Sequence, residues 1–320
     1  DMWRIAAPMI LSNVSVPLLG MVDTGVTGHL DDDAYLGAVA IGSTIFTFVY
    51  MGMNFLRMGT TGVAAQSFGA NDNDGLRASL GQALIVGFLI AIALIVLKIP
   101  ILNLSLTLIG GSAETQGFAR EYFQIRIWSA PGTLANYALI GWFIGLQNAR
   151  VPLFIVLTIN GVNIVLDLMC VVVLGMKVDG VALASVFAEY SGLAVGVSFA
   201  ISTLLKRAGT WPLHRLHRIG AYRAFFAVNG NLFIRTMALM GTLFFVTAQG
   251  ARLGGTILAA NAVLLNFQHL AAFGLDGFAH AAEAMVGKAI GEKSRAALVH
   301  SVGLALKWSL YFAIGFTAFF

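Results

Sequence analysis

One acidic residue near the start of the chain lies inside a long apolar stretch, where a charge is costly. Asp23 stands in the segment PLLGMVDTGVTGHL, six residues after Pro17. An ionised side chain in hydrocarbon costs at least about 2.5–3.5 kcal/mol, and apolar surroundings favour the neutral form of a carboxyl group. Because proline removes a backbone hydrogen bond, we expect this helix to bend at Pro17. Asp23 is therefore a candidate proton or cation site, unless it lies at the edge of the apolar layer and meets water.

Three further apolar stretches carry polar side chains. The residues are Asn136 and Tyr137 in one stretch, Asn163 and Asp167 in the next, and Ser185 and Glu189 in a third. The second and third pairs are spaced four residues apart, so each shares one helix face. An interior shared by several helices is the least costly place for such groups. We therefore predict that Asp23, Asp167 and Asn163 couple to a proton or cation. The predicted substrate cavity or supporting network is Ser185, Tyr137, Asn136 and Glu189. A network that only fixes helix packing is the alternative.

The second part of the chain offers another pair of carboxylates. Asp276 and Glu283 are seven residues apart, on one face of a helix, which makes them second-lobe cation candidates. Glu283 could instead lie near a helix end, within reach of Lys288. Arg57 and Arg235 are candidates for buried pairing, but the sequence does not name their partners.

Signals for soluble enzymes and metal sites are weak. The histidines lack metal-ligand spacing, there is no GxSxG motif, and Cys170 is the single cysteine. GKAIGEKS at 287–294 lacks the residue order of a phosphate loop and fits a GxxxG helix face better. We therefore expect no metal or cofactor beyond a coupling ion, and we expect a transporter rather than an enzyme.

Composition indicates the elements that must carry these side chains. The 320 residues are 58% hydrophobic and 11% charged, whereas soluble domains are about a quarter charged. A membrane-spanning helix needs about 20 mostly apolar residues. On this basis nine spans are predicted, and because the last ends within an apolar run, about three more are expected to follow. The ranges are 3–28, 35–68, 77–104, 117–147, 151–174, 178–205, 225–253, 256–290 and 296–320.

The distribution of basic residues predicts the orientation of these spans. With the N-terminus in the cytoplasm, inside segments hold eleven Lys and Arg residues and outside loops hold three. The basic segment KRAGTWPLHRLHR at 206–218 is then a cytoplasmic loop rather than a nucleic-acid site.

An internal repeat accompanies the spans. Residues 36–84 align without gaps on 258–306, at an offset of 222 residues. Two parallel repeats predict an all-α integral membrane protein with two lobes, as in several secondary transporters. The predicted domains are an N-terminal six-helix lobe at 1–205, a cytoplasmic linker at 206–224 and an incomplete C-terminal lobe at 225–320.

Four segments resemble the multidrug and toxin extrusion (MATE) family, and among its members the DinF-like bacterial branch. They are APMILSNVSVPLLGMVDTGVTGHL, FLRMGTTGVAAQSFGA, NGVNIVLDLM and LDGFAHAAEAMVGKAIG. The resemblance implies a two-lobed bundle of two six-helix repeats, working as a monomer in the bacterial inner membrane. It also implies a proton site at Asp23, supporting roles for Asn163, Asp167 and Ser185, and a helix bend at Pro17.

The activity that this resemblance implies is cation-coupled export of organic, often cationic, drugs by alternating access. Asp276 and Glu283 do not clearly match the sodium-binding pattern of other branches, which favours protons over Na⁺. One alternative is a lipid-linked oligosaccharide flippase of the related superfamily, which would need several cationic groups in its cavity. The first-lobe candidates are instead mostly acidic or neutral. A membrane-embedded enzyme is a weaker alternative.

Overall fold

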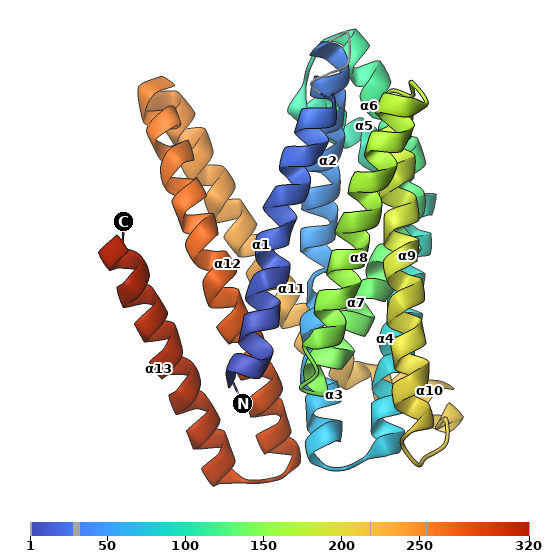
Figure 1. Ribbon diagram of the computed structural model, residues 1–320, viewed down its shortest axis with the longest axis vertical. Helices are drawn as coiled ribbons and strands as arrows, with labels where there is room; N and C mark the ends of the chain where they lie inside the picture. The colour runs from blue at the N-terminus through green and yellow to red at the C-terminus, as the bar shows by residue number, and fades with distance from the viewer. Residues whose placement is uncertain (1, 28–32, 218, 254, 320) are drawn as a thin grey trace.

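A computed structural model describes the backbone of residues 2–27, 33–217, 219–253 and 255–319. Within these helices, some side chains are not described: those of 16–24, 26, 27, 33, 217, 219, 221, 223–228, 244, 247, 248, 250–253, 255–259, 262, 263 and 266. The described backbone forms helices and no β-strand. Their arrangement is an elongated bundle (Figure 1).

The helices follow one another with short connections. In chain order they are α1 (Met2–Thr27), α2 (Asp33–Met53), α3 (Phe55–Gly69), α4 (Asn73–Val96), α5 (Lys98–Ile109), α6 (Ala113–Arg126), a 3₁₀ turn (Ile127–Ser129), α7 (Ala130–Gly145), α8 (Arg150–Asp167), a π-helical turn (Leu168–Val173), α9 (Val178–Leu205), α10 (Leu213–His217), α11 (Ile219–Leu253), α12 (Gly255–Gly291) and α13 (Arg295–Phe319). The sequence explains several of the ends. Asp72 caps α4 by accepting a hydrogen bond from the Gly75 N–H, and Gly110 ends α5 with a positive φ of 78°.

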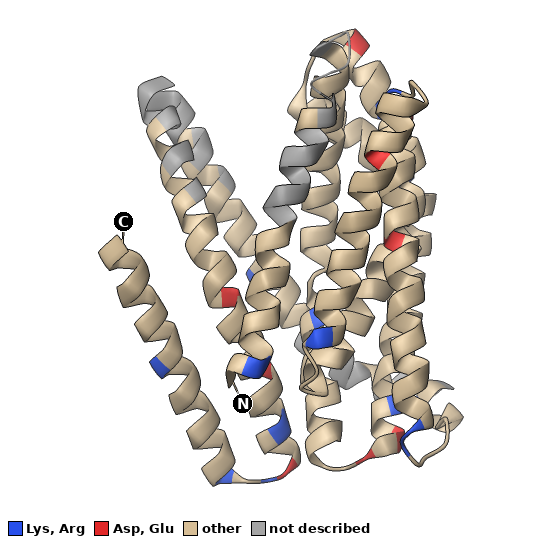
Figure 2. Ribbon diagram, viewed as in Figure 1, with Lys and Arg blue, Asp and Glu red and all other residues tan. Residues whose placement is uncertain are grey.

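Five stretches within the described residues are long and apolar enough to cross a membrane. They are Ala34–Gly69, Asn73–Val96, Arg150–Val173, Val178–Leu205 and Arg295–Phe319. Within the described residues, the nine ranges predicted from sequence fall on helices, but three of them, 35–68, 77–104 and 117–147, are divided between consecutive α-helices. The helical class of the fold is thus confirmed, while the number of membrane crossings stays a prediction. Most Lys, Arg, Asp and Glu residues lie toward the helix ends (Figure 2).

The repeat predicted from sequence matches the observed helix ends. An offset of 222 residues carries the start of α2 and the end of α3 onto the two ends of α12, and it carries the start of α4 onto the start of α13. The correspondence fails at one place: α2 and α3 are separated by a turn at Asn54, whereas α12 is continuous through the equivalent Asp276.

The two halves of the chain pack against each other at one end. A Cβ on Gly69 would lie 2.1 Å from the Lys288 carbonyl oxygen, and a Cβ on Gly291 would lie 2.1 Å from the Gln66 carbonyl oxygen. Glycine therefore lets the backbones of α3 and α12 approach closely there. The contact is at the end that carries the α3–α4 and α12–α13 turns, and α11, α12 and α13 lean away from α2 and α5–α9 toward the opposite end (Figure 1).

Helix α1 joins the halves. It packs against α12 and α8 more extensively than against α2, its neighbour in sequence. Buried Met2, Ile5 and Met9 belong to one apolar cluster with Trp142 of α7 and Phe278 of α12. Through this cluster α1 lies beside both repeats. A change in the shape of α1 would therefore alter its contacts with each repeat.

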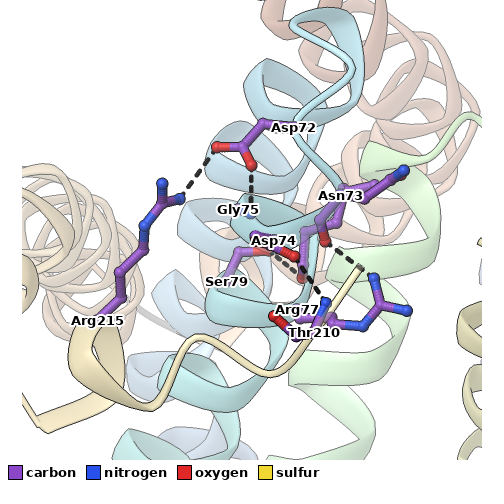
Figure 3. A network of polar contacts seen from close by, with 9 residues as sticks. Asp72, Asn73, Asp74, Gly75, Arg77, Ser79, Thr210 and Arg215 are labelled. Carbon is purple, nitrogen blue, oxygen red and sulfur yellow. Dashed lines mark hydrogen bonds and ion pairs between the residues drawn. The ribbon is translucent and has the colours of Figure 1, made fainter. Parts of the chain in front are cut away.

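The linker between the halves is fastened to the first one (Figure 3). Buried Arg77 donates through Nη2 to the carbonyl oxygens of Leu204 and Arg207, at 2.9 and 2.8 Å. Asp74 accepts from the Thr210 N–H at 2.9 Å, and Arg215 forms an ion pair with Asp72 at 3.0 Å. The start of α4 therefore holds the segment that leads into α11.

Candidate functional site

A central cavity of about 510 Å³ opens between the two halves. Its walls come from α1, α2, α3, α6, α7, α8 and α12, so helices of both repeats enclose it. The lining residues are Met9, Ser12, Asn13, Phe46, Thr47, Tyr50, Met51, Asn54, Arg57, Arg126, Tyr137, Ile140, Val156, Phe273, Asp276 and His280. Apolar and aromatic side chains with a few polar groups are typical of a small-molecule site.

A second cavity of about 490 Å³ adjoins the first. Five residues line both cavities, namely Met51, Asn54, Arg57, Asp276 and His280. Arg235 and Glu283 are among the residues that line the second cavity but not the first. The offset of 222 residues pairs Met51 with Phe273 and Asn54 with Asp276, and each pair lines the first cavity. The cavities therefore lie where the two repeats meet.

Arg57 links the halves at this point. Its Nε donates to Oδ1 of Asn54 at 2.9 Å, and its Nη1 lies 3.0 and 3.1 Å from the two ring nitrogens of His280. A guanidinium group only donates hydrogen bonds, so one of the two ring nitrogens of His280 is the acceptor here. Oε2 of Glu283 lies 3.8 Å from Nδ1 of His280. Charged and polar groups from α3 and α12 thus form one cluster beside the cavities.

An aromatic wall forms another side of the first cavity. The ring of Phe46 stacks on Tyr50 and on Phe123, with centroids 5.6 and 4.9 Å apart. The Arg126 guanidinium lies 5.2 Å from the Phe46 ring centroid and donates to the Tyr122 hydroxyl. Cation–π contact and this hydrogen bond hold Arg126 against the wall.

Helix α8 turns a polar face toward α1. Asn160 donates to the Ser15 hydroxyl at 2.8 Å, and Asn163 and Asp167, one and two turns farther on, are buried. Asn163 and Asp167 thus lie on one buried face of α8, while their part in coupling stays a prediction. The side chains of Asp23 and Pro17 lie outside the described part of α1, although the helical backbone continues through both positions.

The other predicted first-half residues also lie inside the bundle. Asn136 of α7 donates through Nδ2 to both the backbone oxygen and Oε2 of Glu189 on α9, each at 2.9 Å. Ser185 is buried on α9 and lines neither cavity. Of the predicted residues, Tyr137, Asp276 and Glu283 line the cavities just described, whereas Asn163, Asp167, Ser185, Asn136 and Glu189 do not.

Two sequence-based interpretations need correction. Glu283 does not pair with Lys288, which instead forms an ion pair with Glu292 at 3.5 Å. The spacing of four residues between Lys288 and Glu292 places them on one helix face at the end of α12, away from Glu283. The first cavity also receives guanidinium groups from Arg57 and Arg126, so its first-half wall is less acidic than the sequence suggested.

Sequence reasoning missed Arg126 and His280. Arg126 ends α6 and carries no spacing signal, because its position depends on aromatic residues of α2 and α6. His280 could have been found, since it lies four residues after Asp276 and three before Glu283 on one face of α12. The described residues contain no group of three His, Cys, Asp or Glu side chains suited to a metal ion.

Comparison with known proteins shows which family the chain matches. The MatE family model matches residues 8–169. DNA damage-inducible protein F of Escherichia coli is 41% identical over 93% of this chain and 65% of its own length. Protein DETOXIFICATION 44, chloroplastic, of Arabidopsis thaliana is 27% identical over 89% of this chain and 56% of its own length. The chain thus spans less than two thirds of the length of either relative.

Solved structures share the fold. A multidrug resistance MATE family transporter of the MOP superfamily, in an outward-facing conformation, superposes with a TM-score of 0.88. The match covers 99% of this chain and 70% of that one, at 20% sequence identity.

Proposed function

The chain belongs to the MatE family, and from that membership we propose that it is a cation-coupled antiporter exporting organic, often cationic, compounds across a bacterial cytoplasmic membrane. The observation that carries this proposal is the central cavity, which both repeats line with equivalent residues. A site on the boundary between two repeats can be exposed to either side when the lobes rock. No metal or cofactor beyond the coupling ion is required, and the partners are small organic molecules and the bilayer around a monomer.

The packing of the halves supports alternating access. Close backbone contact between α3 and α12 at Gly69 and Gly291 closes one end of the interface. The basic residues of the linker and of the α12–α13 turn lie at that same end, which would place it in the cytoplasm. In this orientation the N-terminus is cytoplasmic and the cavity faces outward.

The coupling site proposed here lies between α1 and α8. Asp23 is eight residues beyond Ser15, and Asp167 is seven residues beyond Asn160, the partner of Ser15. At about 1.5 Å per residue, the backbone positions of Asp23 and Asp167 stand at similar heights on neighbouring helices. Protonation of Asp23 would weaken its hydrogen bonds to the polar groups of α8 and α9, including Asn163 and Ser185.

Bending of α1 would then transmit protonation to the cavity. Met9, Ser12 and Asn13 of α1 line the cavity, and Pro17 follows one turn later. A bend at Pro17 would shift α1 against α12 and crowd the space available to a bound drug. The Asn136–Glu189 contact would hold α7 and α9 in place during this movement.

The second half offers a further cation site. Asp276 lines both cavities, and Glu283 lines the second, beside His280. These carboxylates suit the positive charge of a substrate, or Na⁺ if the transporter uses sodium. Their position in α12, apart from the α1–α8 pair, allows the two roles to be separated by mutation.

Ethidium transport tests the proposal. The full chain is reconstituted into proteoliposomes, and ethidium movement is followed under a pH gradient, under a Na⁺ gradient and with neither. Movement that depends on the pH gradient is expected. Absence of ethidium movement under every gradient would reject multidrug export.

A lipid-linked oligosaccharide flippase is the second candidate, because Arg57 and Arg126 line the cavity and guanidinium groups bind pyrophosphate well. Translocation of a fluorescent lipid-linked pyrophosphate sugar, in liposomes where ethidium does not move, would favour it. Turnover of either compound into a new product would instead indicate an enzyme.

A further inference from the structure

Arg57 occupies an unusual place for a permanent positive charge. It lies within the apolar stretch Ala34–Gly69, in the first turn of α3 and three residues after the turn at Asn54. A charged group at this depth is costly, and it is commonly found facing a water-filled cavity or a partner of opposite charge. Arg57 lines both cavities, so its charge faces the space that substrates would occupy.

The protein partners of Arg57 are neutral. Asn54 and His280 accept its hydrogen bonds through Nε and Nη1. Among the described residues, no carboxylate lies within 4.0 Å of the guanidinium, and Nη2 has no hydrogen-bond acceptor. Asp276 lines the same cavities but does not form an ion pair with it. The N–H groups of Arg57 Nη2 therefore remain available to donate hydrogen bonds to an anionic group in the cavity.

The geometry points to Arg57 as the centre of an anion subsite, which binds the carboxylate or sulfonate group of an amphipathic substrate. This inference rests on the proposed export function and specifies which compounds the exporter accepts. A planar guanidinium matches a two-oxygen anion, and the bond is stronger where water is partly excluded. Arg126 lines the same cavity, where its guanidinium is held against Phe46 and Tyr122 and adds positive charge to the wall.

The remaining lining suits the rest of such a molecule. Phe46, Tyr50 and Phe273 supply aromatic surface for an apolar body. Asp276 supplies one negative charge. A cationic ring system that carries a carboxylate would therefore place its positive charge near Asp276 and its carboxylate near Arg57. A purely cationic compound would use only Asp276 and would gain nothing from Arg57.

A latch between the lobes is the competing role for Arg57, since it contacts His280 of the other half. A latch would affect all substrates alike, whereas an anion subsite affects only those that carry the anion. The pair of rhodamine B and its ethyl ester separates these roles, because the two dyes differ in a single carboxylate.

The experiment measures concentration-dependent export of both dyes by the full chain in proteoliposomes. The variants are Arg57→Gln, which removes the charge, Arg57→Lys, which keeps it, and Arg120→Gln, which removes a charge from an exposed residue bonded to Asn103. Loss of a charge-assisted hydrogen bond is expected to raise the KM for rhodamine B by about tenfold or more in Arg57→Gln. The KM for the ester should stay within about twofold, because the ester has no charge for Arg57 to bind. Arg57→Lys should recover much of the rhodamine B export, and Arg120→Gln should match the unchanged protein.

Each other result has a definite meaning. Equal losses for both dyes in Arg57→Gln would overturn the anion subsite and indicate a latch. Export of the ester but not of rhodamine B by the unchanged protein would also overturn it, while leaving the proposed function in place. Failure to move either dye, together with failure to move ethidium, would reject the proposed function itself.

Discussion

Asn54 and Asp276 line the same two cavities, although 222 residues separate them in the chain. They occupy equivalent positions in the two repeats, so the amide and the carboxylate face one space from both halves. The repeats have diverged here in charge and in backbone. Asn54 interrupts the helical rod beside Arg57, whereas Asp276 lies within the uninterrupted α12. The cavity therefore has repeat-related walls with different chemistry.

Replacing Asp276 by Asn should weaken the binding of cations. The KM for ethidium is expected to rise about fivefold, because a charge pair in a partly hydrated site is worth on the order of 1 kcal/mol. Asp276→Glu keeps the charge and should stay close to the unchanged protein. Concentration-dependent transport in proteoliposomes measures the effect, and an unaltered KM in Asp276→Asn would show that substrate cations bind elsewhere.

Replacing Asp23 by Asn should abolish transport driven by a pH gradient. An amide cannot take up the proton that we propose for this position, so export should fall to the level of liposomes without protein. Ethidium binding by the detergent-solubilised variant should persist, because the cavity lining is unchanged. Full pH-driven export by Asp23→Asn would exclude Asp23 as the coupling residue, and the same measurement on Asp167→Asn would then test its α8 counterpart.

Replacing Gly69 by Ala should disturb the closed end of the interface. The added Cβ would lie 2.1 Å from the Lys288 carbonyl oxygen, on backbone that has little freedom to move. Overpacking of this kind costs about 1–3 kcal/mol. The thermal unfolding midpoint in detergent should fall, and export should slow. Gly303→Ala is the matched control, because a Cβ on Gly303 meets no atom within 4 Å. Equal midpoints for the two variants would contradict the close contact.

The helical stretches followed from local signals in the sequence, but the breaks inside them, such as those at Asn54 and Leu97, did not. Apolar stretches of sufficient length indicated the long helices. The gapless alignment of 36–84 on 258–306 related α2 and α3 to α12. The buried face of Asn163 and Asp167 followed from their spacing of four residues. These features depend on neighbours in the chain, which the sequence displays directly.

Contacts between distant helices were beyond sequence reasoning. The pairing of Asn136 with Glu189 joins α7 to α9, and the approach of Arg57 to His280 joins α3 to α12. Both depend on how the helices rotate and pack, which no spacing within one helix reveals. The repeat offset nevertheless related Asn54 to Asp276 and Met51 to Phe273, two long-range relationships of the cavity that the sequence contained.

The fastening of the linker should depend more on Arg77 than on Asp72 (Figure 3). Arg77 is buried and bonds to the carbonyl oxygens of Leu204 and Arg207, so Arg77→Gln should cost about 1–3 kcal/mol by leaving these partly buried acceptors unsatisfied. The Asp72–Arg215 pair is 40–44% exposed at its side chains, and Asp72→Asn should cost less than about 1 kcal/mol. Thermal unfolding in detergent compares the two, and a larger effect of Asp72→Asn would contradict this order.

Acid should weaken the Asp72 contact. Burial alone would raise the pKa of Asp72, but hydrogen bonds from the Gly75 N–H and Arg215 outweigh it and hold the pKa below its usual value of 3.8. A carboxyl group with a lowered folded-state pKa stabilises the fold above the unfolded pKa, and this contribution is lost as the pH falls through the folded value. The difference in unfolding midpoint between the unchanged protein and Asp72→Asn should therefore be present at neutral pH and shrink as the pH falls below 3.8.

Labelling of single cysteines should reveal the orientation of the bundle. Cys170 is buried and is the only cysteine, so Cys170→Ser gives a background without thiols. Thr210→Cys places a thiol on the exposed linker and keeps the backbone N–H that Asp74 accepts, whereas Glu114→Cys places one at the exposed start of α6. Because basic loops stay in the cytoplasm, an impermeant maleimide should label Glu114→Cys in intact cells and Thr210→Cys only after permeabilisation. The reverse pattern would put the closed end of the interface outside, and the cavity would then face inward.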